Sequence, residues 1–356
     1  MTITDILRQR LYNQHLIGEK LATPGEVVRW FGAVQAQDFL NSLYAIALRL
    51  PNTTEQLVEQ AIADKTIVRS WPMRATIHYM PPEEARWMLK LLAQRQNTKY
   101  MGMYRKVGLS EDIFAQAGDV LAKTLQGGKR LTRKELYDAL ETAGIDTGGE
   151  QRGLHILGYW SREGLLCLGP RRGKQPTFTL LDEWIPPAPL LEGDEALATL
   201  ARRYFISHGP ATIADFTWWT GLTTTEARRA AQCVEGEFAQ EKVDGQLYLF
   251  PASQAAPIPQ DGPIAHLLPS YDEFTVAYKD RSAFLDPQFF EQSFHGLYAG
   301  IFVDGKMLGL WKRTLTKDAV TVTLTFFAPP TQEQRAAIEQ TAAHYGRFLG
   351  LPVVLE

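Results

Sequence analysis

Apolar residues recur at helical spacing along most of this chain, and the pattern breaks at glycines, prolines and helix-capping residues. The middle of the sequence is clearest. Residues 111–126 predict an amphipathic helix, and Thr132 with Glu135 has the capping-box spacing that opens a second helix. Residues 149–164 predict a third helix, and residues 165–180 read as strand, basic turn and strand. Helices followed by such a hairpin are typical of a winged helix.

Two further segments repeat this order. Residues 194–251 predict helices and then a hairpin that turns at Asp244-Gly245. The first 90 residues predict a more divergent copy, with helices at residues 4–14 and 53–63. Between them a helix is expected to open at Thr23-Pro24 and to continue through Gln35 and Gln37.

The divergent copy is expected to end in strands and a helix. Residues 67–80 predict two short strands around Trp71-Pro72, and residues 83–106 predict a helix with a basic end.

The last hundred residues follow a different pattern. Residues 266–274 predict a strand that enters an acidic turn, and residues 300–313 predict a hairpin with Asp304-Gly305 at its tip. Residues 319–327 predict another strand, and residues 331–348 a final amphipathic helix. The predicted fold class is therefore α+β, with three tandem winged-helix units followed by a C-terminal antiparallel β-rich segment. The expected domains are residues 1–108, 109–188, 189–258 and 259–356.

Composition narrows the class of protein. The chain has 356 residues, of which 45% are hydrophobic and 22% charged, which suits two to three domains with real cores. Cys167 and Cys233 lack metal-site spacing and favour a reducing, cytoplasmic setting. No apolar run reaches the roughly 18 residues of a membrane helix, and the N-terminus does not read as a signal peptide.

Charge is unevenly distributed. The net charge of −3 speaks against a general polyanion binder, but residues 1–180 carry +6 and residues 181–356 carry −9. A basic first half is consistent with a nucleic-acid face there, although chance asymmetry would give the same numbers.

Gln35-Ala36-Gln37 is the most distinctive local pattern. An amide donates and accepts hydrogen bonds but does not titrate, so two amides can hold one water without becoming charged. Taken alone, such a pair is more often solvated helix surface than a site.

Four motifs, in this order, carry a resemblance to a known family. They are residues 34–37 (VQAQ), 69–78 (RSWPMRATIH), 267–281 (LLPSYDEFTVAYKDR) and 303–313 (VDGKMLGLWKR). With them, the chain resembles the bacterial winged-helix DNA glycosylases typified by AlkZ and YcaQ. In that family activity follows a Gln-Φ-Gln or Gln-Φ-Asp motif, where Φ is apolar. The resemblance implies a monofunctional glycosylase in which Gln35 and Gln37 position the hydrolytic water.

The resemblance also implies a shape and a partner. The three winged helices would form a C-shape whose concave face holds double-stranded DNA, and residues 300–313 best match a hairpin that probes the minor groove. The expected substrate is an alkylated purine, and the protein is expected to act as a monomer near the nucleoid. No metal and no cofactor are expected, since the sequence has no Walker loop, dinucleotide fingerprint or zinc spacing.

The chemistry expected of such a site is simple. An N7-alkylated guanine is cationic and leaves as a neutral base, so little general-acid help is needed. The enzyme must supply an oriented water and stabilise the sugar oxocarbenium ion. Neutral amides suit the first task. No general base is evident, because Asp38 would project roughly 100° away on a helix.

Several basic and polar residues are candidates for DNA contact. Thr76 and His78 share one face of a predicted strand, but His78 is equally well explained as a satisfied core histidine. The arginines could contact phosphates or pair with acidic neighbours, and basic turns are also ordinary surface. The candidates are Arg69, Arg74, Thr76, His78, Arg105, Lys106, Arg171, Arg172, Lys174, Lys312 and Arg313.

Other charged and aromatic residues are given structural roles. Asp272 and Glu273 are expected to pair with groups such as Lys279 or Arg281, and Trp218-Trp219 to lie in the core.

Two other functions compete with a glycosylase. One is a noncatalytic winged-helix DNA-binding protein or transcriptional regulator, and the other is a protein scaffold supported by the acidic half. Residues 154–160 would form the recognition helix of a regulator, but they are largely apolar, which favours the enzyme.

Overall fold

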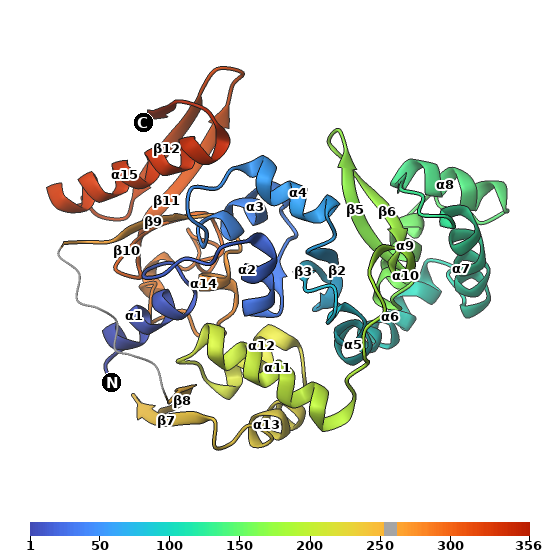
Figure 1. Cartoon of the computed structure of the whole chain (residues 1–356), viewed down its shortest axis with the longest axis horizontal. Helices are drawn as coiled ribbons and strands as arrows, with labels where there is room; N and C mark the ends of the chain where they lie inside the picture. The colour runs from blue at the N-terminus through green and yellow to red at the C-terminus, as the bar shows by residue number, and fades with distance from the viewer. Residues whose placement is uncertain (253–261) are drawn as a thin grey trace. The chain divides into compact units, whose positions relative to one another are not determined.

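The computed structural model describes residues 1–252 and 262–356. The chain forms two compact units (Figure 1). Unit 1 consists of Met1–Val58 with Leu197–Glu356, and unit 2 is Glu59–Ala196. These units are larger than the four expected domains, whose organisation stays a prediction, and the expected boundary at residues 258 and 259 lies outside the described residues.

Unit 2 contains the elements predicted in the middle of the chain. The Thr132–Glu135 capping box is present, because each side chain bonds the other's backbone N–H. The helices close over a core that includes Leu121, Leu136 and Phe178. Their bounds are α7 Glu111–Leu125, α8 Arg133–Thr142, α9 Arg152–Arg162 and α10 Leu181–Trp184.

The sheet of unit 2 is antiparallel, with strands in the order β3-β2-β5-β6-β4. Its strands are β2 Val68–Met73, β3 Thr76–Met80, β4 Leu131–Thr132, β5 Leu166–Arg172 and β6 Gln175–Leu180.

The turn between β2 and β3 is predicted at Trp71-Pro72 and lies instead at Arg74-Ala75. Both turn residues have φ near +50°, at +51° and +57°, which is the region that a type I′ turn requires.

The helix predicted over residues 83–106 is interrupted. It forms as α5 Ala85–Met88, a π-helical turn at Leu89–Ala93 and α6 Gln94–Lys106. A π-helical insertion shifts the faces of the helix on either side of it, so one continuous amphipathic pattern does not describe this segment.

The N-terminal part of unit 1 corrects an important prediction. Helix α2 (Pro24–Phe31) ends before the glutamines, because Gly32 adopts a φ of +77°. Gln35 lies instead in the short strand β1 (Val34–Gln35). Asp38 is the N-cap of α3 (Phe39–Ala47) and accepts a hydrogen bond from the Asn41 N–H at 3.1 Å. The helices expected at residues 4–14 and 53–63 form as α1 (Ile3–Asn13) and α4 (Glu55–Ala63).

Residues 193–251 form three helices and a two-stranded sheet, as predicted. The elements are α11 Gly193–His208, α12 Ile213–Thr220, α13 Thr224–Gln232, β7 Phe238–Val243 and β8 Gln246–Pro251. The hairpin turns at Asp244-Gly245, where both residues have positive φ.

The C-terminal segment builds a five-stranded sheet in the order β13-β12-β11-β10-β9. All pairs are antiparallel except β12 with β13. Helix α15 (Gln332–Leu349) packs against β9, and the short α14 (Glu273–Val276) follows that strand along the chain. The strands are β9 Ala265–Leu268, β10 Gly300–Val303, β11 Lys306–Leu315, β12 Val320–Phe326 and β13 Val353–Leu355.

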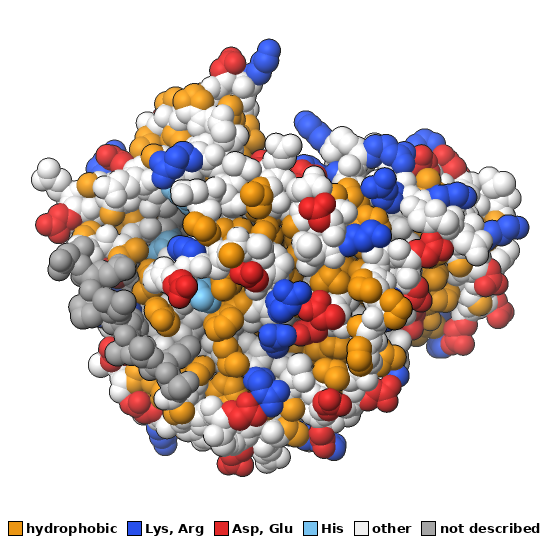
Figure 2. Space-filling view, viewed as in Figure 1, with side chains coloured by type: hydrophobic (Ala, Val, Ile, Leu, Met, Phe, Trp, Pro, Cys, Tyr) orange, Lys and Arg blue, Asp and Glu red, His pale blue; other side chains and the backbone are white. Residues whose placement is uncertain are grey.

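The hairpin predicted at residues 300–313 forms, but Gly305 at its tip is buried, between exposed Asp304 and exposed Lys306. A Cβ placed on Gly305 would lie 3.1 Å from Leu7 Cβ and 3.5 Å from Phe274 Cζ, so the tip packs inside unit 1. The next hairpin, β11–β12, has an exposed tip at residues 314–318. Figures 1 and 2 show this tip projecting at the top of the view, with charged side chains at its end.

Candidate functional site

The Gln35-Ala36-Gln37 segment is non-helical and joins α2 to α3. Gln35 is 6% exposed and Ala36 is fully buried, whereas Gln37 is exposed. The Gln37 backbone N–H donates to Gln35 Oε1 at 2.5 Å. In the predicted helix, side chains two positions apart would project roughly 200° apart. The observed backbone instead brings the Gln35 amide onto Gln37.

The buried Glu273 side chain fixes this segment through a hydrogen bond to its backbone. Its carboxylate is 1% exposed, and Oε1 accepts the Gln35 backbone N–H at 2.7 Å. Oε2 accepts Trp219 Nε1–H at 3.0 Å and lies 3.3 Å from His208 Nε2. A buried carboxylate requires such donors, and hydrogen bonds to a charged acceptor are the stronger kind. Glu273 therefore fixes the backbone at Gln35.

His208 is a neutral partner of this carboxylate. Burial lowers the pKa of His208, and hydrogen bonding to Glu273 only partly opposes that effect. Because a carboxylate oxygen can only accept, we assign the ring proton to Nε2. Nδ1 then lies 2.8 Å from the Ser207 hydroxyl, which itself donates to the Arg203 carbonyl at 2.7 Å.

Asp272 anchors the same turn to the end of α3. Its two oxygens accept from Arg49 Nη1 and Nη2, each at 2.8 Å, and both side chains are almost fully buried. Arg49 also donates to Gln14 Oε1 at 3.0 Å. The structural roles predicted for Asp272 and Glu273 fit this network. The sequence suggests nearby Lys279 or Arg281 and gives no sign of Arg49 and His208, which are distant along the chain.

The paired tryptophans differ from each other. Trp219 is fully buried, as predicted for a core residue, but Trp218 is 40% exposed. Trp218 donates to the Val276 carbonyl at 3.0 Å, and the Arg281 guanidinium lies 5.3 Å from its ring centre. The core prediction is therefore wrong for Trp218.

In unit 2, the motif around β2 and β3 is mostly buried. His78 is fully buried, with Nδ1 3.0 Å from the Thr76 carbonyl and Nε2 3.5 Å from Arg74 Nη2. Arg69 is 7% exposed, and Arg74 and Thr76 are half-buried. His78 thus has the hydrogen-bonded core setting that is one of the two expectations for it.

The arginines of the β5–β6 wing are paired within unit 2. Arg171 makes a bidentate ion pair with Glu59, with both N–O distances 2.8 Å. Arg172 pairs with Glu135 at 2.8 Å. The pKa of Glu135 is lowered to about 2, first by the Thr132 backbone N–H and then by Arg172. Lys174 is exposed at the turn, and Figure 2 shows Lys and Arg side chains gathering near this end of the hairpin.

The remaining basic candidates lie on α6 and β11. Arg105 and Lys106 are exposed, and Arg105 is 4.0 Å from Glu111. Lys312 is exposed on β11, whereas half-buried Arg313 donates to the Tyr345 hydroxyl. Lys106, Lys174 and Lys312 are therefore exposed lysines of the predicted set.

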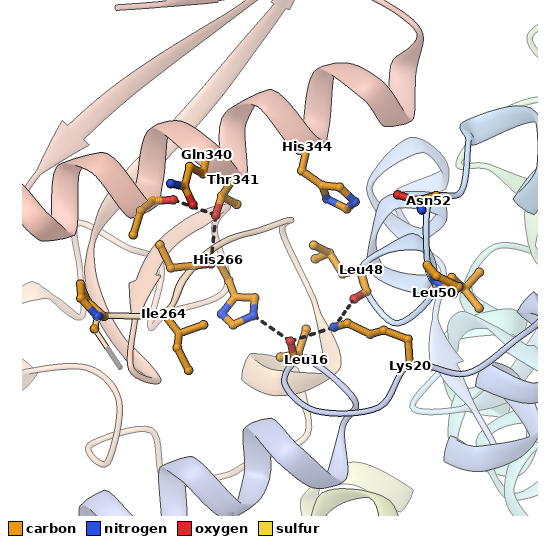
Figure 3. Close-up of a pocket in the computed structure, with 15 residues that line it drawn as sticks. Leu16, Lys20, Leu48, Leu50, Asn52, Ile264, His266, Gln340, Thr341 and His344 are labelled. Carbon is orange, nitrogen blue, oxygen red and sulfur yellow. Dashed lines mark hydrogen bonds between the residues drawn. The ribbon is translucent and has the colours of Figure 1, made fainter. Parts of the chain in front are cut away.

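A separate cavity of about 520 Å³ lies beside α15 and contains Lys20 (Figure 3). Burial lowers the pKa of Lys20 to about 7, a value that would suit an amine nucleophile. However, Nζ donates to the His15, Leu16 and Leu48 carbonyls at 2.7, 2.8 and 2.9 Å. An ammonium with all three donors used has no lone pair to attack a sugar, so Lys20 is a structural cation.

Neither a metal cluster nor a membrane span is found in the described part of the chain. Within residues 1–252 and 262–356, no group of three or more His, Cys, Asp or Glu side chains could hold a metal ion. No helix in the same residues is long and apolar enough to cross a membrane.

Comparison with known proteins identifies the family. The model of the family described as "DNA glycosylase AlkZ-like" matches residues 28–348. An interstrand DNA cross-link repair glycosylase from Streptomyces sahachiroi is 27% identical over 96% of this chain and 95% of its own length. The solved structure of DNA glycosylase AlkZ from S. sahachiroi covers all of both chains with a TM-score of 0.80 at 23% identity, which shows the same fold. This chain therefore belongs to the AlkZ-like family and is a DNA glycosylase of DNA repair.

Proposed function

We propose that this glycosylase hydrolyses the N-glycosidic bond of alkylated purines, of the N7-alkylguanine type, including bulky or crosslinked adducts. The observation that carries the proposal is the pair of neutral amides at Gln35 and Gln37. The buried Glu273 carboxylate accepts the Gln35 backbone N–H and so fixes this pair. The relative from S. sahachiroi is named for interstrand cross-link repair, which makes a crosslinked duplex a second substrate to test.

The two amides are not equivalent. Gln35 Oε1 already accepts the Gln37 backbone N–H, and within the described residues nothing accepts a hydrogen bond from Gln35 Nε2. Gln35 is thus suited to donate to a water, and the exposed Gln37 amide can accept from it. A water bound in this way would point its remaining lone pair in one fixed direction.

This arrangement suits a substrate that is already positively charged. Hydrolysis of an uncharged glycoside usually requires a carboxylic acid to protonate the leaving group. An N7-alkylated guanine departs as a neutral base, so the enzyme needs orientation of the nucleophile more than acid catalysis. Glu273 is unsuited to protonating a leaving group, since it is 1% exposed and faces N–H donors.

DNA binding is proposed to follow the winged-helix arrangement expected from the sequence, a C-shape of three units that acts as a monomer on double-stranded DNA. Because Gly305 packs against α1, whereas residues 314–318 are all exposed, we assign the groove-probing role to the β11–β12 hairpin, which carries Lys312 and Lys317. Lys106 and Lys174 are proposed phosphate contacts. Arg171 and Arg172 are already engaged by carboxylates.

The test is a single-turnover assay on a duplex that carries one N7-methylguanine. Alkaline treatment converts each abasic site to a strand break. Wild type should release the base, and Gln35→Ala/Gln37→Ala should be slower by roughly 100-fold with unchanged DNA affinity. Gln56→Ala, which removes an exposed glutamine of α4, is the matched control and should retain the wild-type rate.

Two results would contradict the proposal in different ways. Wild-type protein that releases neither N7-methylguanine nor a base from a crosslinked duplex would refute the substrate class. Release that persists in the double variant would refute the role of the amide pair and leave the substrate class intact.

A further inference from the structure

The segment between α14 and β10 exposes aromatic side chains. Phe294 is 45% exposed and Tyr298 is 49% exposed. Their rings stack on one another, with centres 5.4 Å apart and planes 26° from parallel. Because both side chains are nearly half exposed, their rings present apolar surface to water.

The backbone that presents these rings is strained. Phe294 and His295 have φ values of +50° and +55°, a region that is unfavourable for bulky side chains. Hydrogen bonds hold the strained segment in place, from His295 N–H to the Phe290 carbonyl at 2.6 Å and from Tyr298 N–H to the Ser293 carbonyl at 3.2 Å. The strained backbone therefore holds a phenylalanine whose side chain stays nearly half exposed.

The sheet register brings this segment next to the chain that leads to Glu273. Gly300 pairs with Leu268, so the chain before Gly300 and the chain after Leu268 leave the sheet together. The Tyr271 N–H donates to the Leu297 carbonyl at 3.0 Å, which joins the two segments directly. Tyr271 is two residues before Glu273, whose carboxylate holds Gln35.

Basic side chains lie beyond the same end. Strand β11 pairs with Gly300 at Leu310 and continues past it to the tip of the β11–β12 hairpin. Lys312 and Lys317 are exposed there, together with Asp318. In the aromatic segment itself, Glu291 lies 3.8 Å from His295. An aromatic face with lysines beyond the same end of the sheet matches the chemistry of an unpaired nucleotide, which has a base to stack and a phosphate to pair.

We propose that Phe294 and Tyr298 form a stacking platform for a DNA base that has lost its neighbour at the reacting nucleotide. The proposal rests on the assigned glycosylase activity, and it adds two residues that position the DNA. Extrusion or removal of one base leaves a gap in the stack, and an aromatic ring can fill it. A fully paired duplex offers no free base face, so the platform should act only where stacking is broken.

The experiment compares two duplexes that need no catalysis. One carries a tetrahydrofuran abasic analogue opposite cytosine, and the other is the same duplex fully paired. Phe294→Ala and Tyr298→Ala should weaken binding to the abasic duplex by roughly 5- to 160-fold, the effect of losing one base–aromatic stack. Binding to the paired duplex should change by less than about twofold. Leu247→Ala, at an exposed leucine of β8, is the matched control and should alter neither.

A further variant separates binding from folding. Phe294→Gly removes the ring and relieves the positive φ, which offsets the lost burial, so the unfolding midpoint should change little while abasic-site binding weakens. Equal loss of binding on both duplexes, or no loss on either, would overturn the proposal. Because abasic binding is measured without base release, an inactive enzyme on N7-methylguanine would refute the substrate class and leave this result standing.

Discussion

The role of Glu273 can be tested by one isosteric change. Glu273→Gln keeps the size of the side chain but replaces one acceptor oxygen with an NH2 group. In one orientation of the new amide, its oxygen lies at the Oε2 position and accepts from Trp219 and His208. In the other, it lies at the Oε1 position and accepts the Gln35 N–H. In the first orientation the NH2 group faces the Gln35 N–H, so two donors meet and the backbone at Gln35 is released.

The magnitude follows from the hydrogen bonds that the substitution removes. A hydrogen bond to a charged group contributes about 1.5–3 kcal/mol, and a buried donor without a partner costs about 1–3 kcal/mol. The two effects together should lower the unfolding free energy of the variant by about 2.5–6 kcal/mol. For a unit of this size each kcal/mol lowers Tm by roughly 2–4 °C. A displacement of the amide pair by a fraction of an ångström should slow base release by about 10- to 100-fold.

The assay measures the rate of base release at saturating enzyme and low temperature, where the variant is still folded. Thermal unfolding gives the stability of the same samples, and binding to the tetrahydrofuran duplex gives DNA affinity. Asp215→Asn is the control. Asp215 is 2% exposed in the same unit and accepts from Thr212 and Lys279 N–H groups, but it bonds neither Gln35 nor Glu273.

The two variants separate a positioning role from a structural one. Both should lower Tm, but only Glu273→Gln should slow base release, and DNA affinity should stay near the wild-type value in both. Glu273→Gln that melts earlier yet releases base at the wild-type rate would refute the reasoning, because the carboxylate would then support the fold without orienting the amides.

Three further predictions concern pH, the buried turn and the salt dependence of binding. Burial lowers the pKa of His266 to about 4 from 6.5, so the unfolded chain takes up its proton first as the pH falls. As the pH falls from 6.5 to 4, the free energy of unfolding measured with urea should fall by up to about 3 kcal/mol more in wild type than in His266→Gln. Parallel plots of unfolding free energy against pH would contradict this. Gly305→Ala should lower the unfolding free energy by about 1–3 kcal/mol, because φ is +80° and the new Cβ would crowd α1. Lys317→Ala should change the unfolding free energy by less than about 0.5 kcal/mol and should weaken DNA binding. A Gly305→Ala variant as stable as wild type would show that Gly305 does not pack against α1. Lys174→Gln should reduce the slope of log affinity against log salt by about 0.9, while Arg171→Gln, already paired with Glu59, should leave the slope unchanged and lower Tm; equal slopes in both would exclude a phosphate contact at Lys174.

Local signals predict most of the elements. The Thr132–Glu135 capping box and the Asp244-Gly245 turn depend on neighbours within a few residues, so the sequence alone identifies them. The end of α2 carries a similar but weaker signal. Gly32 stops the helix and Asp38 caps the next one, but the apolar residues between them continue the helical pattern and favour the wrong prediction.

Other features depend on contacts that no local pattern reveals. The β2–β3 turn places Arg74 and Ala75 at positive φ, where glycine or asparagine would be expected, so the surrounding strands must impose the turn. Glu273 reaches the Gln35 N–H across 238 positions of sequence. The motif that contains Glu273 is recognisable in the sequence, but its partner is found only in three dimensions.

The non-helical backbone at Gln35 allows the Gln35 and Gln37 amides to act on the same water. Had α2 continued, residues 35 and 37 would face different directions and could not share one water. Because the helix stops at Gly32, Gln35 Oε1 is occupied by the Gln37 N–H, and only its amide nitrogen is left to donate. Ala36, between them in the sequence, is fully buried. The pair therefore has a buried donor at Gln35 and an exposed amide at Gln37, and Glu273 holds Gln35 in place through its backbone N–H.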